Sequence, residues 1–304
     1  MANITSEIIK AKAKELGAAV CGIGRLDLFA GVNPQRDPKM ILPNAKCIIG
    51  FGFIVPKALY KSKERNAADY AYTNLGVKYN DEELAEIFLL KIGGMIEDAG
   101  YDACLQKSVP NLRVKGDKTT NPEVKDTYEL IHAVPVEDGK PEPDVIIDFG
   151  LAAKACGIGE TGMSGHILNP KYGPFMRWCF IITDAPLDCD EPLTEPVCDH
   201  CGDCLAACPG HAISEEGLDT WQCAVYYKGA HRSNPFQKPD FLADHPEREA
   251  ILSGEKRFDA VSAREIFPKL DFMPQTNWGY APCLCGKKCD MACYLHLKEK
   301  GVLA

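Results

Sequence analysis

The spacing of cysteines near residue 200 constrains this chain more than any other feature of its sequence. Cysteines stand at positions 198, 201, 204 and 208, and Pro209 follows the last of them. This C-x2-C-x2-C-x3-C-P spacing is typical of bacterial ferredoxins, in which three cysteines bind one iron–sulfur cluster and the fourth binds another. Structural zinc sites are the alternative, but they usually pair two C-x2-C knuckles separated by roughly a dozen or more residues. The run therefore predicts [4Fe–4S] clusters.

A second cluster needs four more thiolates, and five later cysteines are available for them: Cys223, Cys283, Cys285, Cys289 and Cys293. By analogy with two-cluster ferredoxins, we expect the first cluster to be bound by Cys198, Cys201, Cys204 and Cys293. The second would be bound by Cys208, Cys223, Cys285 and Cys289. Cys285 is preferred to Cys283 because its spacing to Cys289 is closer to the usual one. A single cluster, with the later cysteines structural, is the alternative.

The remaining six of the fifteen cysteines are scattered singly, at Cys21, Cys47, Cys104, Cys156, Cys179 and Cys189. A disulfide framework suits short exported domains, and this chain has 304 residues and no recognisable export signal. We expect the scattered cysteines to be small buried hydrophobes.

Charge and hydropathy narrow the classes of partner. The formal net charge is −9, which disfavours general nucleic-acid binding but leaves room for a small basic patch that holds one structured RNA. No apolar run reaches the roughly 20 residues of a membrane helix. We therefore expect a cytoplasmic protein that does not bind membranes.

The N-terminal part alternates helix and strand patterns. A helix is predicted from a cap at Thr5 or Ser6 to Gly17, and a buried strand over residues 47–55. A second helix is predicted to begin at a capping box of Asn80 and Glu83 and to end at Gly100. Its apolar stripe would be Leu84, Ile87, Phe88 and Met95.

Residues 110–143 contain five prolines and are predicted to be loop. Asp144 is expected to cap a third helix that runs to about Cys156, and residues 180–183 read as another buried strand. Proline-rich residues 186–196 then mark a boundary. We predict an α+β protein with a mixed α/β body over residues 1–190 and a ferredoxin-like double-cluster module over residues 191–304.

The stretch from Leu151 to Leu187 resembles the segment that precedes the clusters in corrinoid-dependent iron–sulfur reductases. These are the epoxyqueuosine reductases and the reductive dehalogenases. The shared features are an Ala-rich helix, the turn Gly157-Ile158-Gly159, the segment from Pro170 to Pro174, and a strand that ends in Thr183-Asp184. The sequence GIGETG also partly matches a dinucleotide-binding fingerprint, but it does not follow a predicted strand.

The resemblance implies a nitroreductase-like core in which a corrinoid lies between the body and the clusters. The residues that would approach the corrinoid are Gly157, Gly159, Glu160, Gly162, Gly165 and Gly173. The proton donor of the family is a carboxylate or tyrosine near the corrin, which by position points to Glu142 or Asp144, with Tyr70 and Tyr72 as alternatives. His166, His200 and His211 lie near these motifs and are predicted to be hydrogen-bonding structural residues.

The resemblance therefore implies an oxidoreductase. Electrons from a low-potential donor such as ferredoxin or flavodoxin would pass through two [4Fe–4S] clusters to a cobalamin-type corrinoid, which reduces a small-molecule or nucleoside substrate. Glu160-Thr161-Gly162-Met163 replaces the Trp and Lys that are typical of the epoxyqueuosine branch, which brings the chain closer to the dehalogenase-like branch. The alternatives are a corrinoid-free electron-transfer protein and a reductive activator of a corrinoid protein partner.

Overall fold

The structure of the chain is a computed structural model. It describes residues 4–65, 67, 71–107, 114–115, 129–130, 145–270, 272 and 283–303. Within these ranges no helix has both the length and the apolar character that crossing a bilayer requires. The mixed α/β class predicted for the N-terminal part is confirmed, and its sheet is antiparallel throughout.

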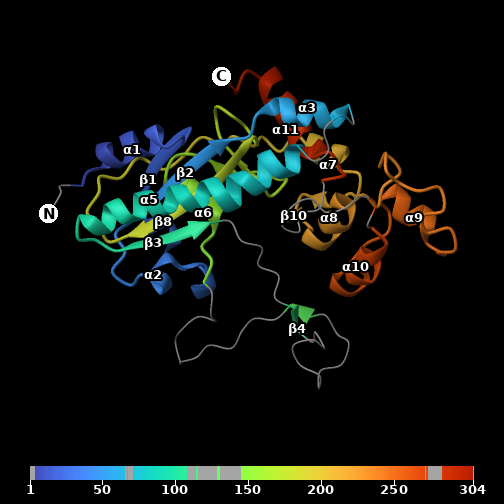
Figure 1. The fold of residues 1–304 in the computed structure, drawn as a ribbon, viewed down its shortest axis with the longest axis horizontal. Helices are drawn as coiled ribbons and strands as arrows, with labels where there is room; N and C mark the ends of the chain where they lie inside the picture. Colours follow the sequence, from blue (N-terminus) through green and yellow to red (C-terminus); the bar gives the residue numbers. More distant parts are fainter. Residues whose placement is uncertain are drawn as a thin grey trace.

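Four strands form the central sheet (Figure 1), in the order β1 (Val20–Arg25), β2 (Cys47–Ile54), β8 (Met176–Thr183) and β3 (Ala103–Lys107). The two central strands are buried along most of their length. Neither face of a strand that is covered on both sides meets solvent, so its sequence is apolar at nearly every position. Both predicted buried strands are therefore present, and the second begins earlier than expected because its first residues pair with the end of β2.

Successive residues of the central strands face opposite layers of helices. Ile49, Phe51 and Ile181 pack in one core with residues of α1 (Ser6–Glu15) and α5 (Ala85–Asp98). Ile48 and Phe180 pack in the other core with α6 (Phe149–Ala155). The sheet is thus the middle layer between two layers of helix, and α5 is seen crossing one of its faces in Figure 1.

The helix α1 starts and stops where the sequence predicted. Thr5 accepts a hydrogen bond from the backbone N–H of Ile8. Gly17, with φ of 101°, terminates the helix.

The second predicted helix begins earlier than expected. A π-helix, η3 (Tyr72–Leu84), runs directly into α5, so the predicted capping box at Asn80 and Glu83 is wrong. The Asn80 amide instead donates to the carbonyl oxygens of Leu75 and Gly76, at 3.1 and 3.5 Å, inside the helix.

The predicted apolar stripe of this helix is correct only in part. Phe88 is buried, whereas Leu84 and Ile87 are 37% and 55% exposed. The wider turn of a π-helix rotates the buried face away from the positions that a 3.6-residue period selects. The helix ends close to Gly100, as predicted, with α5 stopping at Asp98.

The third predicted helix is shorter than expected. The helix α6 starts at Phe149 rather than Asp144, because the Asp148 side chain accepts from the backbone N–H of Leu151 at 2.9 Å and caps it. Asp144 itself lies outside the described residues. The short hairpin of β6 (Glu160–Thr161) and β7 (Ile167–Leu168) connects α6 to β8.

The C-terminal part is built from short elements. They are α7 (Asp203–Ala207), β9 (Ile213–Ser214), β10 (Gly217–Leu218), α8 (Thr220–Tyr227), α9 (Arg248–Ser253), α10 (Ala260–Ile266) and α11 (Lys288–Glu299). The remaining short elements of the chain are η1 (Asp27–Phe29), η2 (Pro34–Arg36), α2 (Pro38–Ile41), α3 (Lys57–Glu64), β4 (Val114–Lys115), β5 (Glu129–Leu130) and η4 (Phe267–Lys269). The helix α11 packs against α7, which brings the end of the chain back to the first cysteine run.

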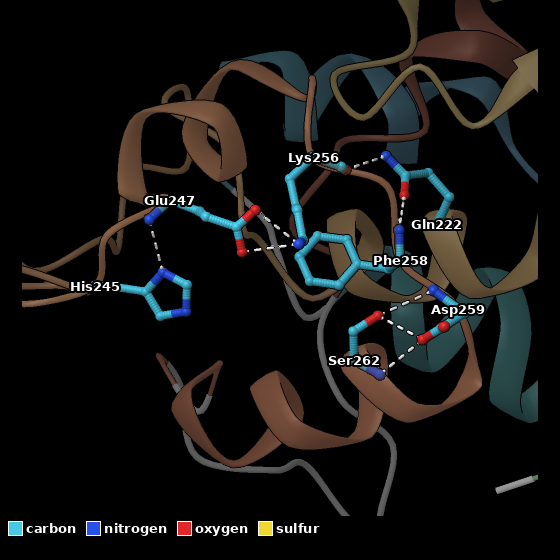
Figure 2. A network of polar contacts seen from close by, with 7 residues as sticks. All are labelled: Gln222, His245, Glu247, Lys256, Phe258, Asp259 and Ser262. Atoms are coloured by element: carbon cyan, nitrogen blue, oxygen red, sulfur yellow. Dashed lines mark hydrogen bonds and ion pairs between the residues drawn. The ribbon is translucent and has the colours of Figure 1, made fainter.

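Residues 229–270 form a lobe beside this module, which we call the accessory unit; it carries α9 and α10 at the right of Figure 1. Its core includes Phe241, Ile251 and Phe258. Figure 2 shows how it is attached. The buried Gln222 amide donates to the carbonyl oxygen of Lys256 at 2.9 Å, and its oxygen accepts from the N–H of Phe258 at 2.9 Å. The predicted division of the chain at residue 190 stays a prediction.

Candidate functional site

The first predicted set of cysteines lines one cavity. Cys198, Cys201, Cys204 and Cys293 all border it, together with Asp199, His200 and His296. Burial raises the pKa of Cys204 to about 11, and the neighbouring Cys198 and Cys201 add to the shift. Cys201 is exposed, so this cavity lies at the protein surface.

The second predicted set lines another cavity. Cys208, Cys223, Cys285 and Cys289 border it, with His166 and Lys287 beside them. Burial, and next the neighbouring Cys285, raise the pKa of Cys223 to about 12.

Cys283 is placed differently from the second set. It is fully buried in a small core with Tyr60 and Tyr72, and its sulfur lies 3.7 Å from that of Cys285. The structure thus brings together the two groups of four that the sequence suggested, with Cys285 and not Cys283 at the second cavity.

The cysteine loops contain residues with a left-handed backbone conformation, which residues other than glycine rarely adopt. His200, His211 and Lys287 have φ values of 57°, 48° and 49°, each within three residues of a cysteine from these two sets. Left-handed backbone of this kind costs energy and concentrates at functional sites. Nothing in the sequence marks these positions, because glycine is the residue that would have signalled them.

Glu160 holds the first cysteine loop. Its carboxylate accepts hydrogen bonds from the backbone N–H groups of Val197 and Cys198, at 2.5 and 3.1 Å. The side chain therefore points at the cluster loop, and it does not line the large cavity described next. The family resemblance implies that Glu160 approaches a corrinoid, and that role stays a prediction.

A third and larger cavity, of about 490 Å³, is also bordered by His166. Apolar and polar residues line it in comparable measure: Arg36, Tyr60, Ile146, Ile147, Asp148, Phe149, Gly150, Thr161, Gly165, His166, Ile167, Pro174, Met176, Arg177 and Trp178. Its volume falls within the range of about 300–1,000 Å³ that is usual for ligand and cofactor sites. A ligand that combines flat apolar surface with polar groups suits this mixed lining.

His166 separates the large cavity from the second cysteine cavity, because it borders both. Its Nε2 lies 2.9 Å from the Nζ of Lys287, and its Nδ1 lies against Oδ1 of Asp290. An ammonium group can only donate, so Nε2 accepts and the ring proton is assigned to Nδ1. As predicted, His166 is a hydrogen-bonding residue, through Nε2, and its Nδ1 is in close contact with the Asp290 carboxylate.

Buried charges surround this histidine. Burial opposes the charge of Asp290, but His166 and Lys287 outweigh it and lower the pKa of the carboxyl to about 2. Burial likewise disfavours the ammonium of Lys287, yet Asp290 outweighs it and raises the pKa. The pair therefore stays ionised, in line with the rule that buried charges are paired.

A second buried ion pair joins the π-helix to the sheet. Arg177 on β8 donates from Nε to Oδ1 of Asp81 at 2.8 Å, and its Nη2 bonds the other carboxylate oxygen. Arg177 also lines the large cavity. The π-helix thereby fixes one wall of that cavity.

Tyr72, a predicted alternative proton donor, is fully buried at the start of this π-helix and does not border the large cavity. Its ring lies 4.8 Å from that of Tyr60, which does border the cavity. Burial raises the pKa of Tyr72 well above its usual value. Glu142, Asp144 and Tyr70 lie outside the described residues, and their roles stay predictions.

The predicted glycines serve the packing of the turn. A Cβ on Gly157, where φ is 67°, would lie 2.5 Å from the carbonyl oxygen of Glu191, and one on Gly159 would lie 2.8 Å from that of Leu168. A Cβ on Gly162 would lie 2.7 Å from the side chain of Leu168, and one on Gly173 would lie 3.3 Å from that of Leu303. Of the predicted corrinoid residues only Gly165 lines the large cavity.

The comparisons with known proteins agree with the resemblance. No protein-family model matches the chain. The epoxyqueuosine reductase of Leadbetterella byssophila is 35% identical over 109 residues, which cover 34% of this chain and 36% of that protein. That of Bacillus cereus is 24% identical over 244 residues, which cover 78% of this chain and 52% of the relative. The chain is a sequence relative of the epoxyqueuosine reductases. It spans no more than about half the length of these two relatives.

Solved structures give matches of the same kind. A selenomethionine-labelled epoxyqueuosine reductase has a TM-score of 0.49 at 16% identity, over 91% of this chain and 68% of that one. A reductive dehalogenase, whose structure is described as suggesting a mechanism for B12-dependent dehalogenation, has a TM-score of 0.48 at 16% identity, over 91% and 40%.

Proposed function

We propose that the chain is an oxidoreductase that carries electrons through two [4Fe–4S] clusters to a corrinoid, which reduces a small organic or nucleoside substrate. The observation that supports this most directly is the order of the three cavities. The first cysteine cavity includes the exposed Cys201, and among the residues that the structure describes His166 is the one that borders both the second and the large cavity.

The donor atoms fit the clusters. Each cysteine cavity is lined by four thiols, and soft sulfur ligands in groups of four select iron–sulfur clusters. The first cluster would be held by Cys198, Cys201, Cys204 and Cys293. The second would be held by Cys208, Cys223, Cys285 and Cys289.

The large cavity is where a corrinoid would be held, between the body and the module. Phe149 and Trp178 would offer it aromatic surface, and Arg36 and Asp148 would offer it polar groups. The bound corrinoid would supply a low-valent cobalt that delivers electrons to the substrate. The chain's own residues would exclude water from the reacting face and, at Glu142, Asp144 or a tyrosine, provide the proton.

The electron donor would be a low-potential protein such as ferredoxin or flavodoxin, and we expect the chain to work in the cytoplasm. One solved epoxyqueuosine reductase is described in complex with a tRNA stem loop that carries its modified nucleoside. A nucleoside substrate is therefore one candidate and a halogenated organic compound is the other.

Cobalt uptake tests the proposal. Thr161 is exposed and borders the large cavity, so Thr161→Trp should obstruct it. Thr194 is an exposed loop residue away from the three cavities, which makes Thr194→Trp the matched control. After anaerobic incubation with cobalamin and gel filtration, wild type and Thr194→Trp should retain cobalt and Thr161→Trp should not, at equal iron content. Full iron with no cobalt in wild type would leave a corrinoid-free electron-transfer or activator role.

A further inference from the structure

The charged residues around the two cysteine cavities are not alike. Asp199 at the first cavity is bonded by both His296 and Lys300, in a setting that is largely open to solvent. The second cavity is instead lined by the cations Lys287 and Lys288. Fixed charges act more strongly where solvent does not screen them, so the buried one of these lysines matters most.

Lys287 is the buried one. Its side chain is 14% exposed, and its Nζ lies 2.9 Å from His166 Nε2 and 3.7 Å from Asp290 Oδ2. The left-handed backbone at this residue turns the chain between Cys285 and Cys289, two lining cysteines of the same cavity. The ammonium thus contacts the residue that borders both the second cysteine cavity and the large cavity.

Lys288 offers an internal comparison. It follows Lys287 directly and borders the same cavity, but its side chain is exposed and its Nζ lies 3.1 Å from the hydroxyl of Ser233. Two lysines of one cavity therefore differ mainly in burial.

Asp290 places a negative charge beside the second cysteine set, opposite in sign to that of Lys287. Its Oδ1 is 3.9 Å from the sulfur of Cys289, so an uncompensated carboxylate here would add negative charge beside the second set. In the structure the Lys287 ammonium pairs with this carboxylate, and Nδ1 of His166 also contacts it.

We propose that Lys287 raises the reduction potential of the second cluster above that of the first. A cluster bound by four thiolates is anionic and gains one more negative charge when it is reduced, so a nearby buried cation favours the reduced form. The step is the transfer of one electron from the reduced first cluster to the oxidised second cluster, and the first cluster is reduced again by a ferredoxin-class donor. The charge arrangement thus biases electron flow from the surface at Cys201 toward the large cavity. This inference rests on the proposed function.

Anaerobic redox titration of the full chain, followed by electron paramagnetic resonance, tests it. Two midpoint potentials are expected, and Cys223→Ser identifies which one belongs to the second cluster. Lys287→Met should move that midpoint to more negative potential and leave the other unchanged. Lys287→Arg should retain it, and Lys288→Met should shift it much less than Lys287→Met.

Asp290→Asn provides a test with the opposite sign, because removing the carboxylate should move the same midpoint to less negative potential. Iron analysis of each variant shows whether both clusters are present. An unchanged midpoint in iron-replete Lys287→Met, or an equal shift in Lys288→Met, would overturn the inference and leave the proposed function standing. Wild-type protein with fewer than two clusters would overturn both. If Lys287→Met does not retain its clusters, the sign of the Asp290→Asn shift decides.

Discussion

Replacing Gln222 by leucine should loosen the accessory unit and, with it, the second cysteine loop. Gln222 is fully buried and its amide makes three hydrogen bonds, to the carbonyl oxygens of Gly210 and Lys256 and from the N–H of Phe258. Gly210 follows the Cys208-Pro209 pair, and Gln222 precedes Cys223. One side chain therefore ties together two lining cysteines of the second cavity and the accessory unit.

The size of the effect follows from these contacts. Leucine keeps the volume but leaves the buried Gly210 oxygen and Phe258 N–H without their partner, at about 1–3 kcal/mol each. The partly buried Lys256 oxygen adds less. We expect a loss of about 3–6 kcal/mol in local stability, which corresponds to a hundredfold or greater increase in the opening equilibrium at roughly 1.4 kcal/mol per tenfold.

Hydrogen–deuterium exchange measured by mass spectrometry over residues 245–262 is the assay, because local opening is what the substitution changes. Gln237→Leu is the matched control: Gln237 belongs to the same unit, is half-buried, and its amide makes one hydrogen bond of 3.3 Å, to the carbonyl oxygen of His231. Iron release to a chelator should also be faster in Gln222→Leu than in the control. Exchange in Gln222→Leu that is no faster than in Gln237→Leu would refute the reasoning.

Three further predictions concern the body and the cysteine loops. Asp81→Asn should lower the free energy of unfolding by about 3 kcal/mol, because the Arg177 guanidinium loses its buried partner. Glu15→Gln breaks the exposed pair with Lys12 and should change the free energy of unfolding by less than about 0.5 kcal/mol in the same denaturation assay. Glu160→Ala should release iron faster than wild type, since the N–H groups of Val197 and Cys198 lose their acceptor, with Glu195→Ala as an exposed control; equal release rates would contradict this role. Burial raises the pKa values of Cys21 and Cys47 to about 12, and the thiolate is the reactive form of cysteine. Both thiols should therefore resist alkylation in the folded protein at pH 8 and react only as the pH rises toward 12 or the chain unfolds. Mass spectrometry that finds them alkylated at pH 8 in native protein would contradict this prediction.

The resemblance to the superfamily and the buried strands could be predicted from the sequence, because both depend on local sequence patterns. The run from Cys198 to Pro209 and the apolar run of β2 can be read without knowing the fold. The relatives that the comparisons found are those that the resemblance named. Starts of helices were less predictable: Asn80 and Glu83 look like a capping box, but the wider turns of the π-helix make them interior residues.

The interior of the site could not be read from the sequence, for a physical reason. His166 is far along the chain from Lys287 and Asp290, which are three residues apart, and it meets them only because the start of α11 packs against the β6–β7 hairpin. Charged residues such as Lys287 are usually exposed, so nothing in their identity announces burial. The resemblance singles out Glu160 through the turn in which it lies, but its hydrogen bonds to the first cysteine loop depend on the tertiary structure alone.

The most direct test of the account is metal analysis of the chain purified anaerobically from cells supplied with cobalamin, together with sulfide analysis and an absorption spectrum. Two [4Fe–4S] clusters and one corrinoid predict about eight irons, about eight sulfides and about one cobalt per chain. About four irons would contradict the two-cluster assignment, and eight irons without cobalt, even after cobalamin is added to the reduced protein, would contradict the reductase.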